Sequence, residues 1–282
     1  NNMILGNRSA SHGGGIYLKN SNAEIINNII VNNSAIGSGS YAGGIYIEGA
    51  GYSPNIISNT ISRNTCTNTQ AQGFYSAGAS PVLRNNIIWY NNITAGNIDM
   101  QIMPTYLANV QYCDIDGGGG YTGTGNININ PLFRLISTGQ GYNYGTLSAD
   151  WSLQASSVLI NSGTPSVAGL KLPATDLRGR SRVFGTIDIG AYEDMTTLNV
   201  CGNITTNTLW NATTINVTCD VTVNSAVTLT IAPGTTVKFA SFTKLTVLGR
   251  LLAIGTASDS ITFTANNIND GWSGIKLNVG SV

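Results

Sequence analysis

Three short segments of this chain repeat one another at a constant spacing of 29 residues. Each carries Gly, an apolar residue and Tyr in the same order: "GGGIYLK" begins at Gly13, "AGGIYIE" at Ala42 and "AQGFYSA" at Ala71. One short strand of this kind cannot bury its apolar side chains alone. The recurrence therefore predicts that equivalent segments stack on one another and bury a shared core.

A second repeat runs beside the first and is marked by Asn and Ile. Its copies are "NNMILGN" from Asn1, "NNIIVNN" from Asn27, "SNTISRN" from Ser58 and "NNIIWYN" from Asn85. The spacings of 26, 31 and 27 residues indicate loops of unequal length between strands of constant length. The aligned positions are Asn2, Asn28, Asn59 and Asn86, then Ile4, Ile30, Ile61 and Ile88, then Asn7, Asn33, Asn64 and Asn91.

These repeats predict an all-β fold, a right-handed parallel β-helix, which is a solenoid of the pectin-lyase-like kind. In such a stack each strand pairs with its equivalents about 4.8 Å above and below, so equivalent side chains form columns. Aligned Asn side chains then pass amide hydrogen bonds along a structural ladder of Asn28, Asn59, Asn86, Asn33, Asn64 and Asn91. The alternative is that Asn only supplies left-handed turn geometry at the corners.

The repeats divide the chain into three segments. Residues 1–125 carry the first coils, and residues 126–197 show no coil repeat, so we expect them to cap those coils and bridge to a second β-helix. Residues 198–282 are expected to form the opening coils of that second, truncated β-helix, because the segment from Asp220 aligns with the segment from Lys244 at an offset of 24. This offset matches Val221 with Leu245, Val223 with Val247, Val237 with Ile261 and Phe239 with Phe263.

The segment between the two repeats resembles a known family. "NININPLF" at residues 126–133, "WSLQASSVLINSG" at 151–163 and "TDLRGRSRVFGTIDIGAYE" at 175–193 are similar to the choice-of-anchor Q module of bacterial β-helix proteins. The part from Leu198 onward looks like the start of a β-helix in secreted surface proteins of Bacteroidetes-type bacteria. The resemblance implies type IX secretion or cell-surface display, with an outer-membrane anchor outside this segment. Asn130 departs from the family pattern, which has Asp before "PLF".

The charge balance argues against two classes of partner. Lys and Arg total 13, Asp and Glu also total 13, and only 9% of the residues are charged. Such a chain has no electrostatic attraction to nucleic acid or to an acidic lipid surface, so we expect neither as a partner. The sequence holds no apolar run long enough to cross a bilayer, so no transmembrane segment is expected in it.

The acidic residues of the first coils are few, which argues against catalysis. A polysaccharide lyase needs clustered carboxylates for Ca²⁺ and a Lys or Arg base, and a glycosidase needs two facing carboxylates. Asp114 and Asp116 lie two apart on a predicted strand, before the Gly-rich loop at residues 117–120. They are the candidate Ca²⁺ ligands, and the alternative is that they cap the turn. No other cofactor is expected.

Tyr17, Tyr46 and Tyr75 are the candidate glycan-binding residues. Strand alternation turns Ile16 and Leu18 inward and therefore turns Tyr17 outward. Stacked coils place the three Tyr side chains in one column, and aromatic rings with polar tips suit sugar rings. The alternative is that the rings stack on one another beneath a loop and only stabilise the strands.

The four cysteines separate into two kinds. Cys201 and Cys219 flank a short Thr- and Asn-rich segment and are a candidate disulfide if the chain reaches an oxidising compartment. Cys66 and Cys113 are expected to be buried free thiols. No CxxC pair occurs, and the single His12 has no zinc-type spacing from any Cys, so a zinc site is not expected.

Together these features favour a non-catalytic protein, secreted or at the cell surface, that serves as an adhesin, a stalk or a glycan-binding surface. A polysaccharide or a cell-surface glycan is its expected partner. The alternative is a polysaccharide lyase or a glycoside hydrolase that acts on one face of the first β-helix. A groove with at least two carboxylates and a base would indicate the enzyme.

Overall fold

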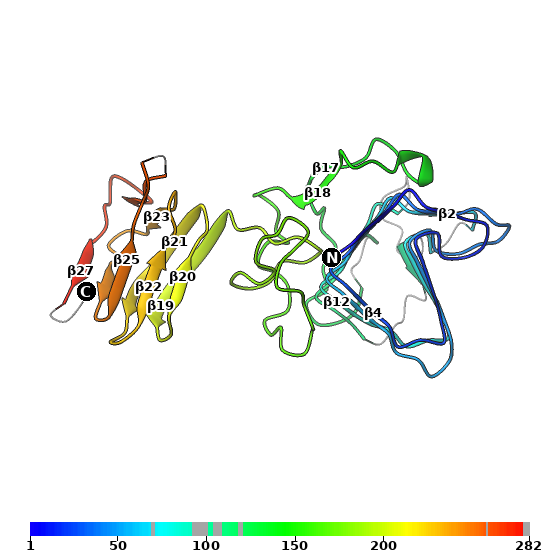
Figure 1. Cartoon of the computed structure of the whole chain (residues 1–282), viewed down its shortest axis with the longest axis horizontal. Helices are drawn as coiled ribbons and strands as arrows, with labels where there is room; N and C mark the ends of the chain where they lie inside the picture. Colours follow the sequence, from blue (N-terminus) through cyan, green and yellow to red (C-terminus); the bar gives the residue numbers. More distant parts are fainter. Residues whose placement is uncertain (69–70, 92–100, 104–108, 118–120, 258, 279–282) are drawn as a thin grey trace. The chain divides into compact units, whose positions relative to one another are not determined.

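The computed structural model describes residues 1–68, 71–91, 101–103, 109–117, 121–257 and 259–278. The chain divides into two compact units, Asn1–Asp194 and Met195–Val282. In both units, short strands pair in parallel with equivalent strands of the neighbouring coils (Figure 1). The predicted all-β parallel β-helix is therefore confirmed.

Four parallel sheets run along the first unit, and each coil contributes one strand to a sheet. The five-stranded sheet contains β1 (Met3–Leu5), β5 (Ile29–Val31), β9 (Thr60–Ser62), β13 (Ile87–Trp89) and β16 (Asp114–Ile115). One four-stranded sheet contains β3 (Ile16–Lys19), β7 (Ile45–Glu48), β11 (Phe74–Ala77) and β14 (Ile102–Met103). The other contains β4 (Glu24–Ile26), β8 (Asn55–Ile57), β12 (Val82–Arg84) and β15 (Val110–Gln111). The three-stranded sheet contains β2 (Arg8–Ser9), β6 (Ser34–Ala35) and β10 (Thr65–Cys66).

The register of these coils follows the sequence repeats. The residues paired along the five-stranded sheet include Ile4, Ile30, Ile61 and Ile88, as the spacing predicts. Their side chains belong to one continuous apolar core inside the coils. Gly is required at the corner before β7, because a Cβ on Gly44 would lie 2.3 Å from the Gly73 carbonyl oxygen of the next coil.

Residues 126–194 pack mainly along the side of these coils. They contain the antiparallel strands β17 (Phe133–Leu135) and β18 (Asp150–Leu153) and the 3-10 helix η1 (Tyr142–Tyr144). Phe133 and Trp151 belong to the same apolar cluster as Ile87 and Trp89, which lie on the outer face of the five-stranded sheet. The sequence predicted a cap at the end of the coils. The structure places this segment along an apolar sheet face, whose burial removes that surface from water.

The second unit contains two sheets of coils. One consists of β26 (Thr262–Ala265), β23 (Thr236–Phe239), β21 (Thr214–Val223), β24 (Leu245–Val247), β27 (Ile275–Leu277) and β19 (Thr197–Ile204). The other consists of β20 (Thr208–Trp210), β22 (Thr228–Ile231) and β25 (Arg250–Ala253).

The predicted register of the second unit is only partly correct. Val221 pairs with Leu245, as the offset of 24 predicts. The predicted match of Val237 with Ile261 is wrong, because Val237 pairs with Phe263 and Phe239 pairs with Ala265. A shift of two residues keeps the same set of side chains on the inner face, so strand alternation alone does not fix this register.

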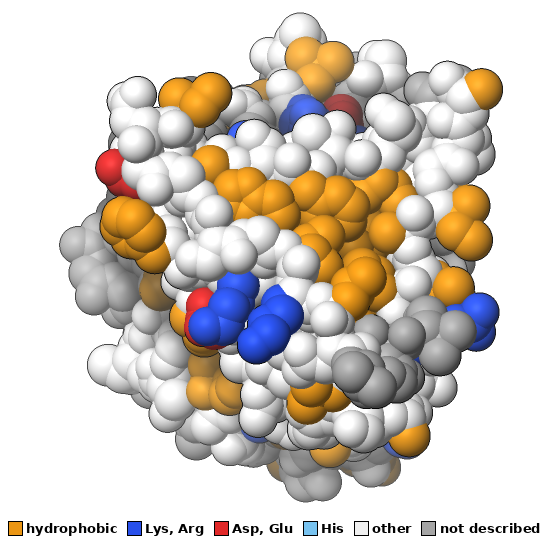
Figure 2. Space-filling view, turned by 90° about the vertical axis from the view of Figure 1, so that its left-hand side faces the viewer, with side chains coloured by type: hydrophobic (Ala, Val, Ile, Leu, Met, Phe, Trp, Pro, Cys, Tyr) orange, Lys and Arg blue, Asp and Glu red, His pale blue; other side chains and the backbone are white. Residues whose placement is uncertain are grey.

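The last described coil of the second unit leaves part of its core exposed. Leu229 and Val237 are fully buried, whereas their partners in the next coil, Leu251 and Phe263, are only half-buried. Figure 2 faces this side of the molecule and shows hydrophobic side chains gathered in the middle of the surface. The core therefore opens toward solvent at this end of the described residues.

Candidate functional site

The three candidate tyrosines lie on the outer face of one four-stranded sheet. Tyr17 of β3 pairs with Tyr46 of β7, and Tyr46 pairs with Tyr75 of β11. The neighbouring Ile45 and Ile47 point inward and are fully buried. Strand alternation and the 29-residue repeat thus bring the three tyrosines into one column.

Most of this column is closed to a ligand. The Tyr46 ring stacks on His12, with 4.4 Å between ring centroids, and on Tyr75, with 5.5 Å between centroids. Tyr75 in turn stacks on Tyr41 at 4.4 Å. Tyr46 is only 6% exposed, so a sugar ring cannot reach its face. In this part of the column the rings stabilise the strands by packing on one another.

His12 and Tyr41 belong to this cluster, and sequence reasoning missed both. They precede the Gly-rich corners of successive coils and are 29 residues apart, which is the spacing of Tyr17 and Tyr46. That shared spacing is the signal that identifies them. The Tyr41 backbone N–H donates to His12 Nδ1 at 2.9 Å, so Nε2 carries the proton of the neutral ring.

The accessible end of the column consists of Tyr17, Lys19 and Glu48. Tyr17 is 45% exposed and meets Tyr46 edge-on, and Lys19 Nζ lies 2.8 Å from Glu48 Oε1. Hydrogen bonds from Lys19 and Tyr17 hold the pKa of Glu48 below its ordinary value, and the bond to Glu48 raises the pKa of Tyr17. The phenol is therefore neutral near pH 7 and is a poor general base. This group offers a ring and an ion pair to a ligand.

Asp114 and Asp116 lie at the end of the five-stranded sheet, and both side chains are buried. The Ile129 backbone N–H donates to Asp114 Oδ1 at 3.0 Å, whereas Asp114 Oδ2 has no hydrogen-bond partner among the described residues. Burial raises the pKa of Asp114 to about 8, so this carboxyl is mostly protonated at neutral pH. Asp116 Oδ2 accepts a hydrogen bond from Gln101 Nε2 at 3.4 Å.

These two carboxyl groups do not by themselves make a Ca²⁺ site. Ca²⁺ takes about six to eight oxygen ligands. In the described part of the chain, no three His, Cys, Asp or Glu side chains are grouped so that they could hold a metal. Residues 118–120 of the adjoining Gly-rich loop lie outside the described residues. Ca²⁺ binding at this strand end stays a prediction.

Two columns of Asn run through the first unit as hydrogen-bond ladders. Asn28 Nδ2 donates to Asn59 Oδ1 at 3.0 Å, and Asn59 Nδ2 donates to Asn86 Oδ1 at 3.1 Å. Each Oδ1 also accepts the backbone N–H of the Asn before it in the column, at 2.9 Å. The second column, with the same contacts, consists of Asn33, Asn64 and Asn91. These amides have little hydrogen-bonding capacity left for a ligand.

The left-handed turn geometry at these corners belongs to the residue before each ladder Asn. The residues with positive φ are Asn27 (58°), Asn32 (55°), Ser58 (55°), Arg63 (57°), Asn85 (56°) and Tyr90 (57°). The ladder Asn residues themselves are absent from the positive-φ set among the described residues. The two roles proposed for Asn from the sequence are therefore both present, at adjacent positions.

Other side chains continue the ladders where a coil supplies no Asn. The Asn86 backbone N–H donates to Cys113 Sγ at 3.4 Å, and Cys113 N–H donates to Asn126 Oδ1 at 2.9 Å. In the second column, Asn91 Nδ2 donates to Gln101 Oε1 at 3.0 Å. Burial raises the pKa of the Cys113 thiol to about 12, so Cys113 is a structural acceptor rather than a reactive thiol.

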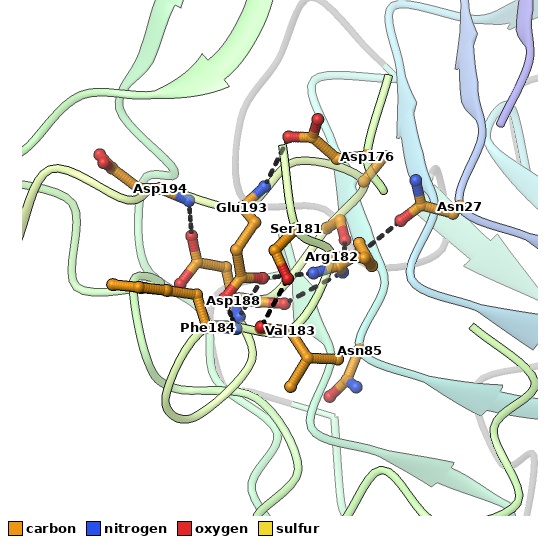
Figure 3. A network of polar contacts seen from close by, with 12 residues as sticks. Asn27, Asn85, Asp176, Ser181, Arg182, Val183, Phe184, Asp188, Glu193 and Asp194 are labelled. Atoms are coloured by element: carbon orange, nitrogen blue, oxygen red, sulfur yellow. Dashed lines mark hydrogen bonds and ion pairs between the residues drawn. The ribbon is translucent and has the colours of Figure 1, made fainter. Parts of the chain in front are cut away.

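A third polar cluster surrounds the buried side chain of Arg182 within residues 126–194 (Figure 3). Arg182 Nη1 lies 2.5 Å from Glu193 Oε2, and Arg182 Nη2 donates to the Gly190 carbonyl at 2.6 Å. Arg182 Nε donates to Oδ1 of Asn27, which lies at a corner of the coils. The guanidinium thus joins the irregular segment to the β-helix.

Asp188 is the second buried acid of this cluster. It accepts the backbone N–H groups of Asn161 at 2.7 Å and Asp194 at 2.6 Å. Burial raises the pKa of Asp188 to about 7 and also raises that of Glu193, while the charge of Arg182 opposes both shifts. The charged groups of this cluster therefore face one another and the backbone.

The cysteines have two structural roles. Cys201 and Cys219 form a disulfide between the paired strands β19 and β21, with their Cα atoms 5.0 Å apart. Neither Cys66 nor Cys113 is in a disulfide; Cys113 is buried as predicted, whereas Cys66 is only partly buried. Burial raises the pKa of Cys66 to about 11, so this thiol is also unreactive near pH 7.

Comparison with protein-family models, with curated proteins and with solved structures finds no match to this chain. Within the described residues, no helix has the length and apolar character needed to span a membrane. Function must therefore be inferred from the side chains of this chain and from their contacts.

Proposed function

We propose that this chain belongs to a non-catalytic β-helix protein that is secreted or held at the cell surface, where it is a stalk, an adhesin or a glycan-binding surface. One observation carries the proposal: the buried acids Asp114, Asp188 and Glu193 of the first unit contact groups of the chain itself. Glu193 faces Arg182, Asp188 accepts two backbone N–H groups, and Asp114 lies beneath the segment that covers its sheet. Carboxylates used in this way are not available to a substrate.

Two features support a location outside the cytoplasm. The Cys201–Cys219 disulfide is typical of proteins from oxidising compartments. The resemblance of residues 126–193 to the choice-of-anchor Q module supports export by the type IX system of a Bacteroidetes-type bacterium. An outer-membrane anchor carried by other parts of the protein belongs to the same proposal.

The glycan-binding part of this proposal involves Tyr17, because Tyr17 is the most exposed of the three candidate tyrosines. Its ring lies beside the Lys19–Glu48 ion pair, which can donate to and accept from sugar hydroxyls. A glycan array tests this role with Tyr17→Ala and Lys19→Ala. The matched control is Lys171→Ala, which removes another exposed ion pair, Lys171–Glu24 with an Nζ–Oε1 distance of 2.5 Å. Binding that survives Tyr17→Ala would exclude Tyr17 as a contact.

Enzymatic activity is the competing function and has a direct test. The chain is incubated with acidic polysaccharides and Ca²⁺, and the ultraviolet absorbance of unsaturated products is followed together with the release of reducing ends. We expect neither signal to rise above that of buffer. Turnover that Asp114→Asn or Asp116→Asn abolishes would replace this proposal with a polysaccharide lyase, and reducing ends without unsaturated products would indicate a glycoside hydrolase.

A further inference from the structure

The loop between β17 and β18 forms a groove of about 360 Å³ that is open to solvent. The groove is lined by residues 135–138, 143–146, 148 and 149. Leu135 is 58% exposed and Tyr144 is 47% exposed, which is unusual for large apolar side chains at one place. No Lys, Arg, Asp or Glu is among the described residues that line the groove.

The Tyr144 ring is held flat along one of its faces. A Cβ on Gly139 would lie 2.4 Å from Tyr144 Cε1, 2.5 Å from Cδ1 and 2.6 Å from Cζ. Three adjoining ring carbons at nearly equal distances place that Cβ over the ring face and not at its edge. The backbone of Gly139 therefore covers one face, and the other face accounts for the exposure of the ring.

Contacts with the β-helix fix the shape of this loop. Asn32 Nδ2 donates to the Gly139 carbonyl at 3.0 Å, and the Tyr142 backbone N–H donates to Ser34 Oγ at 2.9 Å. The Arg8 guanidinium lies 5.1 Å from the centre of the Tyr142 ring. The groove is thus formed before a ligand arrives, so binding does not require the loop to be ordered.

The polar side chains of the groove are neutral, and some are available to a ligand. Ser137 Oγ already donates to the Gly139 carbonyl at 2.9 Å, and the hydroxyls of Thr146 and Ser148 bond to each other at 2.8 Å. The exposed side chains of Asn143 and Thr138 make no hydrogen bond within the described part of the chain. They offer an amide and a hydroxyl beside the free ring face.

We propose that this groove binds a neutral saccharide. Tyr144 stacks on the apolar face of a pyranose ring, Leu135 extends the apolar contact, and Asn143 and Thr138 bond the sugar hydroxyls. The volume lies within the range of about 300–1,000 Å³ that small-ligand sites have, and the uncharged lining offers no partner to an acidic sugar. This inference rests on the proposed function, which it deepens by naming a site and a ligand class.

Calorimetric titration of the whole chain tests the proposal. The probes are cellohexaose, xylohexaose, mannohexaose and laminarihexaose, with polygalacturonate as the acidic comparison. We expect at least one neutral probe to bind, and Tyr144→Ala to weaken it by about tenfold or more, because a stacked ring contributes on that scale. Tyr144→Phe retains the aromatic ring face, so its affinity should stay within about threefold of that of the original chain. Affinity should not change between low and high salt.

Two further variants test whether the saccharide binds at the groove or elsewhere on the chain. Gly139→Ala pushes the ring from its support and should also weaken binding, while Phe242→Ala, which removes an exposed aromatic ring of the second unit, should bind normally. The inference is overturned if no neutral probe binds, if only polygalacturonate binds, or if Tyr144→Ala binds like the original chain. Release of reducing ends from a bound probe would instead refute the non-catalytic function and leave the groove assignment standing.

Discussion

Replacement of Asn59 by Ala should destabilise the first unit by several kcal/mol. The Asn59 side chain is fully buried. Its Oδ1 accepts the backbone N–H of Asn28 at 2.9 Å and the Nδ2–H of Asn28 at 3.0 Å. Its Nδ2 donates to the Ile25 carbonyl at 2.8 Å and to Asn86 Oδ1 at 3.1 Å. Asn59 therefore links three consecutive coils through one amide.

The magnitude follows from the groups that Asn59→Ala leaves buried. The backbone N–H of Asn28 and one Nδ2–H of Asn28 lose their acceptor, whereas the other Nδ2–H still donates to the Ile26 carbonyl at 3.0 Å. Asn86 Oδ1 keeps the Asn59 backbone N–H at 2.9 Å. Two unpaired buried donors at about 1–3 kcal/mol each give a loss of roughly 2–6 kcal/mol in the free energy of unfolding.

Urea unfolding followed by tryptophan fluorescence measures this loss. Trp89 and Trp151 report on the first unit when Trp210 and Trp272 of the second unit are replaced by Phe. Asn2→Ala is the matched control, because Asn2 is exposed at the first coil. In this variant the backbone N–H of residue 2 still donates to Asn28 Oδ1, a bond of 3.0 Å. We expect the control to change the free energy of unfolding by less than about 1 kcal/mol. Equal losses in the two variants would refute the claim that the amide ladder stabilises the coils.

Three further predictions concern charge, burial and covalent links. Because burial raises the pKa of Asp114 to about 8, the folded chain holds a proton that the unfolded chain releases above pH 4, so rising pH favours unfolding. The original chain should therefore lose stability relative to Asp114→Asn as pH rises, by up to about 1.4 kcal/mol per pH unit between pH 5 and pH 8. A stability difference that stays constant with pH in urea titrations would contradict this. Arg182→Leu should lower the free energy of unfolding by about 3–5 kcal/mol, because it leaves Glu193 buried without its partner. A second change, Glu193→Gln, should recover part of that loss in a double-mutant cycle. Fully additive effects would show that the two groups are not coupled. Joint replacement of Cys201 and Cys219 by Ser should destabilise the second unit by about 3 kcal/mol, because the disulfide closes a loop across 18 residues. The fluorescence of Trp210 and Trp272 reports on the unfolding of this unit. An equal loss of stability in the first unit would indicate a different cause.

The fold of the first unit could be predicted from sequence because its coils repeat at nearly constant intervals. The 29-residue spacing alone aligns Tyr17, Tyr46 and Tyr75, and the structure pairs them in that register. In the second unit the intervals are less regular. An offset of 24 and an offset of 26 both keep alternate apolar residues inward, so the sequence does not distinguish them.

The polar contacts of residues 126–194 could not be predicted in this way. Arg182 donates to Asn27, which lies 155 residues earlier in the chain, and no repeat connects the two positions. Whether a ring is accessible is equally hidden from a periodic pattern. Tyr17 and Tyr46 have the same place in their coils, yet one is 45% exposed and the other is 6% exposed. The difference arises because His12 and Tyr75 stack on Tyr46.

One sequence signal does indicate which face of the β-helix is covered. The strands of the tyrosine-bearing sheet alternate, as in "IYLK" of β3, whereas β5 reads "IIV" and β13 reads "IIW". Continuous apolar runs are typical of strands that are buried on both faces. Ile29 and Ile87, on the outer face of the five-stranded sheet, are accordingly buried by residues 126–194.

This covering segment changes where the first unit can meet a ligand. With the five-stranded sheet buried beneath it, the surface left to a ligand includes the exposed Tyr17 of the tyrosine-bearing sheet and the surface of the cover itself. The groove at Tyr144 lies on the cover, and Asn32 and Ser34 of the coils fix its loop. The same packing that removes an apolar sheet face from water therefore also holds a neutral, half-apolar groove open to solvent. If the covering segment only shields the sheet, Tyr144→Ala will leave saccharide binding unchanged. If the groove is a binding site, the same variant will lose affinity for the neutral saccharide.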